Sequence, residues 1–235
     1  EGQTFRVDAR LRPQGNQGPL ARSLGGFTTY YELWGLTWER QALTKARFVA
    51  GDPALGARFQ ELTDRVVYRS PFTDENAREV RRMKARIERE RIPPGEDPQF
   101  HLKLGRGSLS DVEFTVQLLQ LIHGSAHPEL RVPGTIAALG RLRDAGMLEP
   151  DDADALDAAY RFCERARNAH YLQTGQPSDA LPGDRAELHR LGLLLGYVHD
   201  PHIALRDDYR RVTRRARRVV ERVFYQRALT RPGPS

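Results

Sequence analysis

From about residue 72 onward, apolar residues recur three and four positions apart, which is the spacing of one face of an α-helix. In the segment Thr73–Arg91, for example, Val80, Met83 and Ile87 follow this spacing among many charged residues. The same pattern predicts helices over Ser110–His123, Gly134–Ala145, Asp151–Gln173, Arg185–Leu195 and Ile203–Arg227. We therefore expect a helical domain over residues 72–228, followed by a disordered tail over residues 229–235.

The first part of the chain starts with a different pattern. In the segment Thr4–Leu11 apolar and polar side chains alternate, which is the period of a half-buried β-strand. Helical patterns follow over Leu24–Leu33, Leu36–Val49 and Ala54–Tyr68. Because one strand cannot form a sheet, we expect the partner strands to lie upstream of this sequence. The predicted fold class is mainly α (α+β), with the end of a sheet-containing domain over residues 1–68 before the all-helical domain.

Composition excludes several kinds of protein. The 235 residues contain no run of about 18 apolar residues, which excludes a membrane span. Cys163 is the only cysteine, which excludes an internal disulfide and a cysteine-based zinc site. This cysteine falls in the apolar stripe of a predicted helix, so we expect it to be buried and inert. The formal net charge of +6 favours anionic partners without choosing among them. We expect a cytoplasmic protein.

The alternating segment places one carboxylate between two guanidinium groups. Arg6, Asp8 and Arg10 fall on the same face of the predicted strand. A carboxylate on the open face of a sheet can hold a divalent metal ion, and flanking arginines can neutralise phosphate oxygens. The alternative is a ladder of surface ion pairs across the strand, and the local pattern alone favours that ladder.

A basic, glycine-rich turn precedes the helix predicted at 110–123. The run from Lys103 to Phe114 has the sequence KLGRGSLSDVEF. Backbone N–H groups at the start of this helix could bind an anion by donating hydrogen bonds to it. The alternative is a capping box, in which Ser108 pairs with Asp111 or Ser110 pairs with Glu113.

Two further basic segments have similar alternatives. On a helix over residues 38–47, Lys45 or Arg47 could point toward a triphosphate. The alternative is that Trp38 packs in the core and the charged face of the helix is solvated. The last predicted helix carries many arginines, which suits a nucleic-acid surface. It lacks interleaved exposed aromatic residues, which favours a solvated face or a partner-docking face. Its arginines are Arg210, Arg211, Arg214, Arg215, Arg217, Arg218 and Arg222.

Three of these segments together resemble the glutamine synthetase adenylyltransferases. Residues 7–13, with the glycines that follow, resemble the strand that carries the third catalytic carboxylate of that family. Residues 38–47 resemble the next block of the family. Residues 103–114, continued by Gln117, resemble its glycine-rich turn and Asp-x-Glu-Phe helix start. The similarity extends over residues 4–226, and the three blocks in this order are more specific than any one of them.

The resemblance implies a nucleotidyltransferase α/β domain, of which residues 1–68 are the C-terminal part. It also implies a bifunctional enzyme with two related halves. One half attaches AMP from ATP to a tyrosine of glutamine synthetase, and the other half removes it by phosphorolysis. A PII signal protein and glutamine regulate the balance. Residues 207–225 resemble the end of these enzymes in high-GC Gram-positive bacteria, which favours the C-terminal, attaching half over the AMP-removing half.

The resemblance also implies roles for single residues. Asp8 would be a catalytic residue and the third carboxylate ligand of Mg²⁺. Arg10, Lys45 and Arg47 would be candidates for contacting phosphates. The residues that match the family motif at the second helical block are Lys103, Gly107, Asp111, Glu113 and Gln117.

Some parts of the family pattern are absent from this sequence. The upstream Gly-Ser turn and the paired Asp-x-Asp, which would supply phosphate binding and two of the three carboxylates, do not occur before Asp8. We therefore expect the chain alone to be inactive. A hypothesis of another class is a basic helical binding module without catalysis, in which Asp8→Asn would be silent. We expect neither nucleic acid nor a membrane as a partner.

Overall fold

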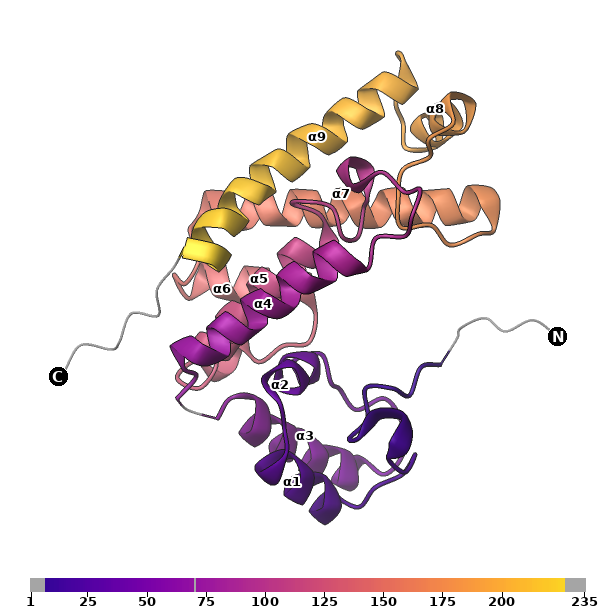
Figure 1. Ribbon diagram of the computed structural model, residues 1–235. Coiled ribbons are helices and arrows are strands. Elements are labelled where there is room, and N and C mark those ends of the chain that lie inside the picture. The colour runs from indigo at the N-terminus through magenta and orange to yellow at the C-terminus, as the bar shows by residue number, and fades with distance from the viewer. Residues whose placement is uncertain (1–6, 70, 227–235) are drawn as a thin grey trace.

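The computed structural model describes residues 7–69 and 71–226, which form an almost entirely helical structure (Figure 1). The α-helices are α1 (Leu24–Leu33), α2 (Thr37–Leu43), α3 (Pro53–Val67), α4 (Asp74–Glu90), α5 (Leu109–His123), α6 (Thr135–Asp144), α7 (Pro150–Thr174), α8 (Arg185–Leu194) and α9 (Pro201–Val220). The 3₁₀ helices are η1 (Gly15–Gln17), η2 (Pro98–Phe100) and η3 (Pro128–Leu130), and the π-helical turn η4 (Glu221–Gln226) follows α9. The mainly α fold class is confirmed.

Several helices begin at capping side chains that the sequence supplies. The Ser23 hydroxyl accepts a backbone N–H at the start of α1, and the carboxylates of Asp52 and Asp184 do so at the starts of α3 and α8. Thr73 and its neighbours cap α4 in the same way. Such caps satisfy donors that the helix itself cannot pair, which explains why the predicted and observed starts agree closely.

The helix predicted over Leu36–Val49 is shorter in the structure, because α2 ends at Leu43. Beyond that residue the Thr44 hydroxyl donates to the Gln41 carbonyl over 2.7 Å. A threonine that bonds its own backbone in this way competes with the continuing helix. The chain then runs irregularly to Gly51, where α3 is about to begin.

The strand predicted over Thr4–Leu11 is not formed in its described part. Residues 4–6 lie outside the described residues, and residues 7–11 form irregular backbone that enters a turn. The Arg12 side chain holds this turn by donating to the carbonyls of Ala9 and Gly18. A strand needs a neighbouring strand to pair its N–H and C=O groups, and residues 7–69 and 71–226 contain only an isolated bridge, between His101 and Ala180. The strand is therefore wrong over residues 7–11.

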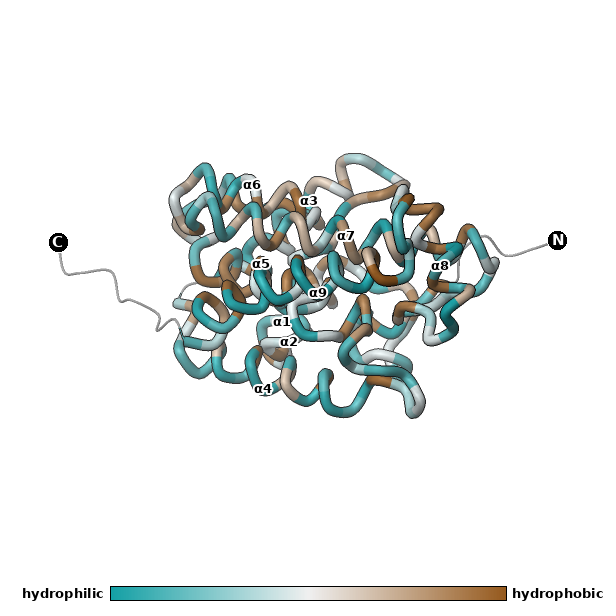
Figure 2. Tube along the Cα trace, turned by 90° about the horizontal axis from the view of Figure 1, so that it is seen from above, coloured by the Kyte–Doolittle hydropathy of each residue, from teal (hydrophilic) through white to brown (hydrophobic). Residues whose placement is uncertain are grey.

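Helices α4 to α7 and α9 share a large apolar core. In Figure 1, α7 crosses behind α9, and α9 also packs against α5 and α8. The tube of α4 is mostly hydrophilic in Figure 2, because this helix turns only a narrow stripe to the core. Buried side chains of the largest cluster include Ala77, Val80, Val116, Leu119, Leu139, Leu142, Leu156, Val219 and Phe224. A second cluster joins α7, α8 and α9 around Cys163, Leu191 and Tyr209.

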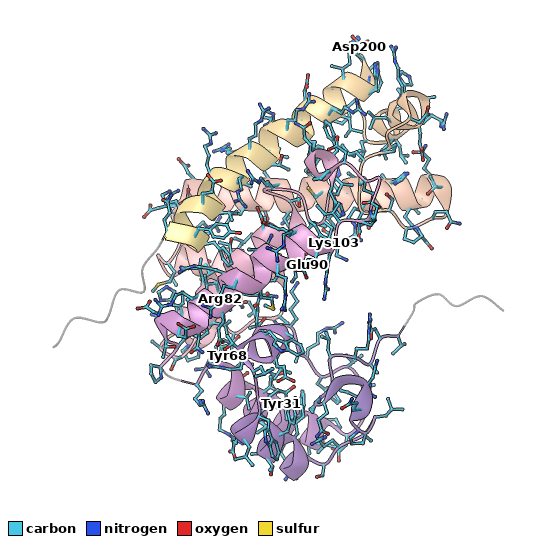
Figure 3. The ribbon with its side chains drawn as sticks, viewed as in Figure 1. Tyr31, Tyr68, Arg82, Glu90, Lys103 and Asp200 are labelled. Atoms are coloured by element: carbon cyan, nitrogen blue, oxygen red, sulfur yellow. The ribbon has the colours of Figure 1, made fainter. Side chains whose placement is uncertain are left out.

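Helices α1 to α3 form a smaller group of their own. Phe27, Tyr31 and Leu62 are the buried residues of its cluster, and Figure 3 shows Tyr31 among the side chains of these helices. The Phe27 and Tyr31 rings lie 4.6 Å apart between centroids, which is within the range of favourable aromatic contact.

The end of α3 contacts both α5 and α2. Val67 and Tyr68, at the end of α3, pack on Leu121 of α5. The buried Arg40 guanidinium of α2 donates to the carbonyls of Val67 and Arg69, each over 3.0 Å. These bonds satisfy carbonyls at the end of α3 and fix the direction in which the chain leaves toward α4.

The predicted division between residues 1–68 and 72–228 falls in the connection between α3 and α4, and it stays a prediction. The tail predicted over residues 229–235 lies outside the described residues. Of the helices described in residues 7–69 and 71–226, none combines the length and the apolar character that crossing a membrane requires.

Candidate functional site

Asp8 and Arg10 contact each other at the surface. The Asp8 carboxylate accepts the Arg10 backbone N–H over 2.9 Å, and Arg10 Nη2 donates to Asp8 Oδ2 over 2.6 Å. Their side chains are 50% and 72% exposed. The hydrogen bond to Asp8, and then the charge of Asp8, raise the pKa of Arg10. The carboxylate is therefore accessible to solvent and lies beside a fixed positive charge.

The second and third sequence blocks meet where α2 packs near α5. Lys45 Nζ lies 2.8 Å from Glu113 Oε1, and Gln41 Nε2 donates to Gln117 Oε1 over 2.7 Å. The two glutamines are buried, whereas Lys45 is exposed. The Tyr160 hydroxyl also donates to Glu113, over 3.3 Å. The Lys45 ammonium has three N–H donors, so the pair with Glu113 leaves donors for another acceptor.

Asp111 lies at the centre of a buried ionic group, which we call the Asp111 cluster: Lys84 and Glu88 of α4, Asp111 of α5 and Arg217 of α9. Lys84 Nζ lies 2.6 Å from Asp111 Oδ1, and Arg217 Nη1 donates to Asp111 Oδ2 over 3.0 Å. Lys84 also pairs with Glu88. Both Lys84 and Asp111 are 0% exposed. Since a buried charge is costly unless it is paired, the cluster holds three helices together.

The pKa values of the cluster show which interactions dominate. Burial alone would raise the pKa of Asp111, but the charge and hydrogen bond of Lys84, the Gly107 N–H and Arg217 lower it below the ordinary value. Burial would lower the pKa of Lys84, but Asp111 and then Glu88 raise it. The pKa of Glu88 is raised, mainly by burial. Asp111 and Lys84 are therefore both charged at neutral pH.

The glycine-rich turn uses its own N–H groups. The Gly107 N–H donates to Asp111 Oδ2 over 2.6 Å, and the N–H groups of residues 108–110 donate to backbone carbonyls. The hypothesis that these N–H groups bind an external anion is therefore wrong, because Asp111 supplies the negative charge at the start of α5. The capping box is wrong as well, since the Ser108 hydroxyl donates back to the Gly105 carbonyl and Glu113 pairs with Lys45.

Gly107 has no room for a side chain. Its φ is +77°, and a Cβ atom there would lie 1.9 Å from the Thr213 carbonyl oxygen of α9. Glycine alone combines this backbone conformation with such a close approach. The turn therefore lies directly on α9 and positions Asp111 for Arg217.

Comparisons with known proteins cover nearly the whole chain. A family model described as "Glutamate-ammonia ligase adenylyltransferase" matches residues 1–62, and one described as "GlnD PII-uridylyltransferase" matches residues 77–225. The chain is 50% identical over 219 residues to a protein of Leifsonia xyli subsp. xyli named bifunctional glutamine synthetase adenylyltransferase/adenylyl-removing enzyme. The chain matches a fragment of the bifunctional glutamine synthetase adenylyltransferases. Through its residues 77–225 the chain belongs to the family that the second model describes.

Two other relatives with the same name agree with this assignment. The chain is 50% identical over 220 residues to the protein of Streptomyces avermitilis and 46% identical over 219 residues to that of Mycobacterium avium. In each of the three comparisons the alignment covers 93% of this chain and 22% of the relative. The chain thus spans about a fifth of the length of these adenylyltransferase family members. The resemblance to the enzymes of high-GC Gram-positive bacteria is confirmed.

Two residues of the Asp111 cluster were not predicted from the sequence. Lys84 was not singled out, and Arg217 was assigned to a solvated or partner-docking face. A signal for Lys84 exists, because it follows Ala77 and Val80 at helical spacing and so falls on the buried stripe of α4. No comparable local signal marks Arg217, whose partner Asp111 lies 106 residues earlier.

The remaining predicted residues lie at the surface. Lys103 is exposed and pairs with Asp179 over 3.5 Å. Arg47 is exposed and lines a pocket with Arg22 and Phe48, near the starts of α1 and α3. All three lysines of the chain, Lys45, Lys84 and Lys103, are thus engaged in ion pairs.

The described residues do not form a complete metal site. Residues 7–69 and 71–226 contain no group of three histidine, cysteine or acidic side chains placed to hold a metal ion. Asp8 has the right chemistry for one oxygen ligand of Mg²⁺, which prefers octahedral oxygen coordination. One carboxylate is not sufficient for such a site.

Proposed function

We propose that this chain is part of an enzyme that transfers AMP from ATP to a tyrosine of glutamine synthetase and so regulates nitrogen assimilation. The relatives that carry the name adenylyltransferase support the reaction class. The single observation that carries the proposal is the exposed Asp8 carboxylate beside Arg10, within the segment that matches the adenylyltransferase model.

In the complete enzyme, Asp8 would be one carboxylate ligand of Mg²⁺, which would neutralise charge on the phosphates. Arg10, and Arg47 from its surface pocket, would contact phosphate oxygens. Lys45 would join them through its remaining N–H donors. The transfer of a nucleotidyl group depends mainly on positioning and on charge stabilisation, and these residues suit both tasks.

Asp8→Asn in the complete enzyme tests the proposal. We expect loss of AMP transfer to glutamine synthetase, measured with radiolabelled ATP, at unchanged folding. Asp144→Asn is the matched control, because Asp144 is also exposed and paired with a neighbouring arginine, Arg143. Full activity of Asp8→Asn would contradict the proposed role and would favour a basic helical binding module without catalysis.

The isolated chain should be inactive, because Asp8 lacks the further carboxylates that a metal site requires. Detectable AMP transfer by the 235-residue chain alone would refute this expectation.

We further propose that the chain comes from the C-terminal, attaching half. The resemblance of residues 207–225 to the end of these enzymes in high-GC Gram-positive bacteria supports this choice. Assays of the complete half with ATP, and separately with phosphate plus AMP-modified glutamine synthetase, distinguish it from the AMP-removing half.

For the partners, we propose that the helical domain over 72–228 shapes the catalytic cleft and docks glutamine synthetase. A PII protein and glutamine would regulate the complete enzyme in the cytoplasm. The match of residues 77–225 to a model described as "GlnD PII-uridylyltransferase" supports a PII protein as a regulator.

A further inference from the structure

Three arginines line one surface pocket between the glycine-rich turn and α9. Arg106 comes from the turn, and Arg210 and Arg214 come from α9. The other lining residues are Pro98, Gln99, Tyr209 and Thr213. Among these described lining residues none is acidic.

The close approach of the turn to α9 creates this arrangement. A Cβ atom on Gly105 would lie 2.8 Å from the Tyr209 hydroxyl, and one on Gly107 would lie 1.9 Å from the Thr213 carbonyl oxygen. The two glycines therefore let the backbone rest on α9, with Arg106 between them. Arg210 and Arg214 are one helical turn apart on that helix, so they are neighbours on its surface.

Three arginines of α9 and η4 outside the pocket have acidic partners. Arg211 pairs with Asp208, Arg217 with Asp111, and Arg222 with Asp152.

By contrast, Arg106 and Arg214 are exposed and form no ion pair within residues 7–69 and 71–226. Arg210 reaches Asp207 over a long 3.4 Å contact, and its guanidinium lies 4.9 Å from the Phe100 ring centroid. Stacking on an aromatic ring restricts where that guanidinium can lie. The three like charges repel one another, and an anion bound between them would offset that repulsion.

The hydroxyl groups beside the pocket are already used. Tyr209 donates to the His101 carbonyl, and Thr213 donates to the Tyr209 carbonyl. Only the guanidinium groups of the three arginines are thus left to donate hydrogen bonds to a ligand. Together they offer more N–H groups than the two oxygens of one carboxylate can accept. A phosphate group, with at least three acceptor oxygens, matches them better.

We propose that the pocket formed by Arg106, Arg210 and Arg214 binds a phosphate-type oxyanion, either free or as the phosphoryl group of a nucleotide. This site is separate from Asp8 and does not depend on the proposed transferase function.

Isothermal titration of the chain with inorganic phosphate, pyrophosphate and AMP tests the proposal and distinguishes the sources. We expect saturable binding of at least one of the three anions. Arg106→Ala and Arg214→Ala should each weaken it by about tenfold or more, since each removes charge-assisted hydrogen bonds. Arg215→Ala is the matched control, because Arg215 is an exposed arginine of α9 that does not line the pocket.

Circular dichroism should show all three variants folded, and Arg106→Lys provides a variant that keeps the charge if Arg106→Ala unfolds. The proposal is overturned if none of the three anions binds, or if Arg215→Ala weakens binding as much as the pocket variants do. It is also overturned if an oligoglutamate peptide binds through these arginines while the phosphate compounds do not, since the surface would then suit an acidic protein partner.

Discussion

The Asp111 cluster predicts that replacement of Lys84 destabilises the fold strongly. In Lys84→Met, a side chain of similar length replaces the cation 2.6 Å from the Asp111 carboxylate. Asp111 remains 0% exposed and keeps Arg217 and the Gly107 N–H as partners. Removal of one member of a buried ion pair costs about 3–5 kcal/mol. Because Arg217 remains, we expect the low end, about 3 kcal/mol.

Urea unfolding at pH 7, followed by circular dichroism, gives the free energy of unfolding of each variant. Lys103→Met is the control, because Lys103 forms an exposed pair, and it should change stability by less than about 1 kcal/mol. The double variant Lys84→Met/Asp111→Leu removes both charges, so it should lose less stability than the sum of the two single variants. A loss below about 1 kcal/mol for Lys84→Met would refute the reasoning, because an exposed pair contributes that much.

The shifted pKa values of Asp111 and Lys84 predict how the stability difference between the wild type and Lys84→Met depends on pH. The folded pKa of Asp111 is lowered, so its stabilisation is fully present above the unfolded value near 3.9 and is lost as the pH falls through the folded pKa. The folded pKa of Lys84 is raised, so its contribution is present below about 10.4 and is lost as the pH rises through the folded pKa. The difference between the wild type and Lys84→Met should therefore shrink at both ends of the pH range.

Three further predictions rest on other contacts. Gly107→Ala should lower the free energy of unfolding in urea by about 2–4 kcal/mol, because Gly107 has a positive φ and its Cβ atom would overlap α9. Gly140→Ala in α6, where the space around the residue is open, should raise it by up to about 1 kcal/mol. Equal effects of the two substitutions would contradict this account. Gln41→Leu should cost about 1–3 kcal/mol because it leaves Gln117 without its buried donor, and the double variant with Gln117→Leu should recover part of that loss. Burial raises the pKa of the Cys163 thiol to about 12, so Ellman's reagent at pH 8 should not react until denaturant is added, and rapid native labelling would show that the thiol is accessible.

The helices could be predicted from the sequence because their causes are local. Apolar spacing, capping residues such as Ser23 and Asp52, and breaks at proline and glycine all lie within or beside each helix. The strand over residues 7–11 failed for the opposite reason, since alternation shows which faces are polar but a strand also needs a partner. The early end of α2 depended on one threonine hydroxyl, which helical spacing does not reveal.

In the candidate site, too, contacts between residues far apart in the sequence could not be predicted. The sequence blocks at 38–47 and 103–114 were recognised as important, but the pairing of Gln41 with Gln117 and of Lys45 with Glu113 was not predicted. The position of Asp111 in the motif gave no sign that it is buried between Lys84 and Arg217. Its partners lie in other helices, so only the packing of α4, α5 and α9 brings these charges together.

The position of Arg217 in the sequence constrains the order in which the helical region can be completed during synthesis. Until α9 has emerged from the ribosome, the carboxylate at position 111 lacks one of its two cationic partners, and the turn at Gly107 lacks the helix on which it rests. The earlier helices can therefore associate but cannot reach their final packing. A nascent chain halted before residue 217 should remain loosely packed and dependent on chaperones.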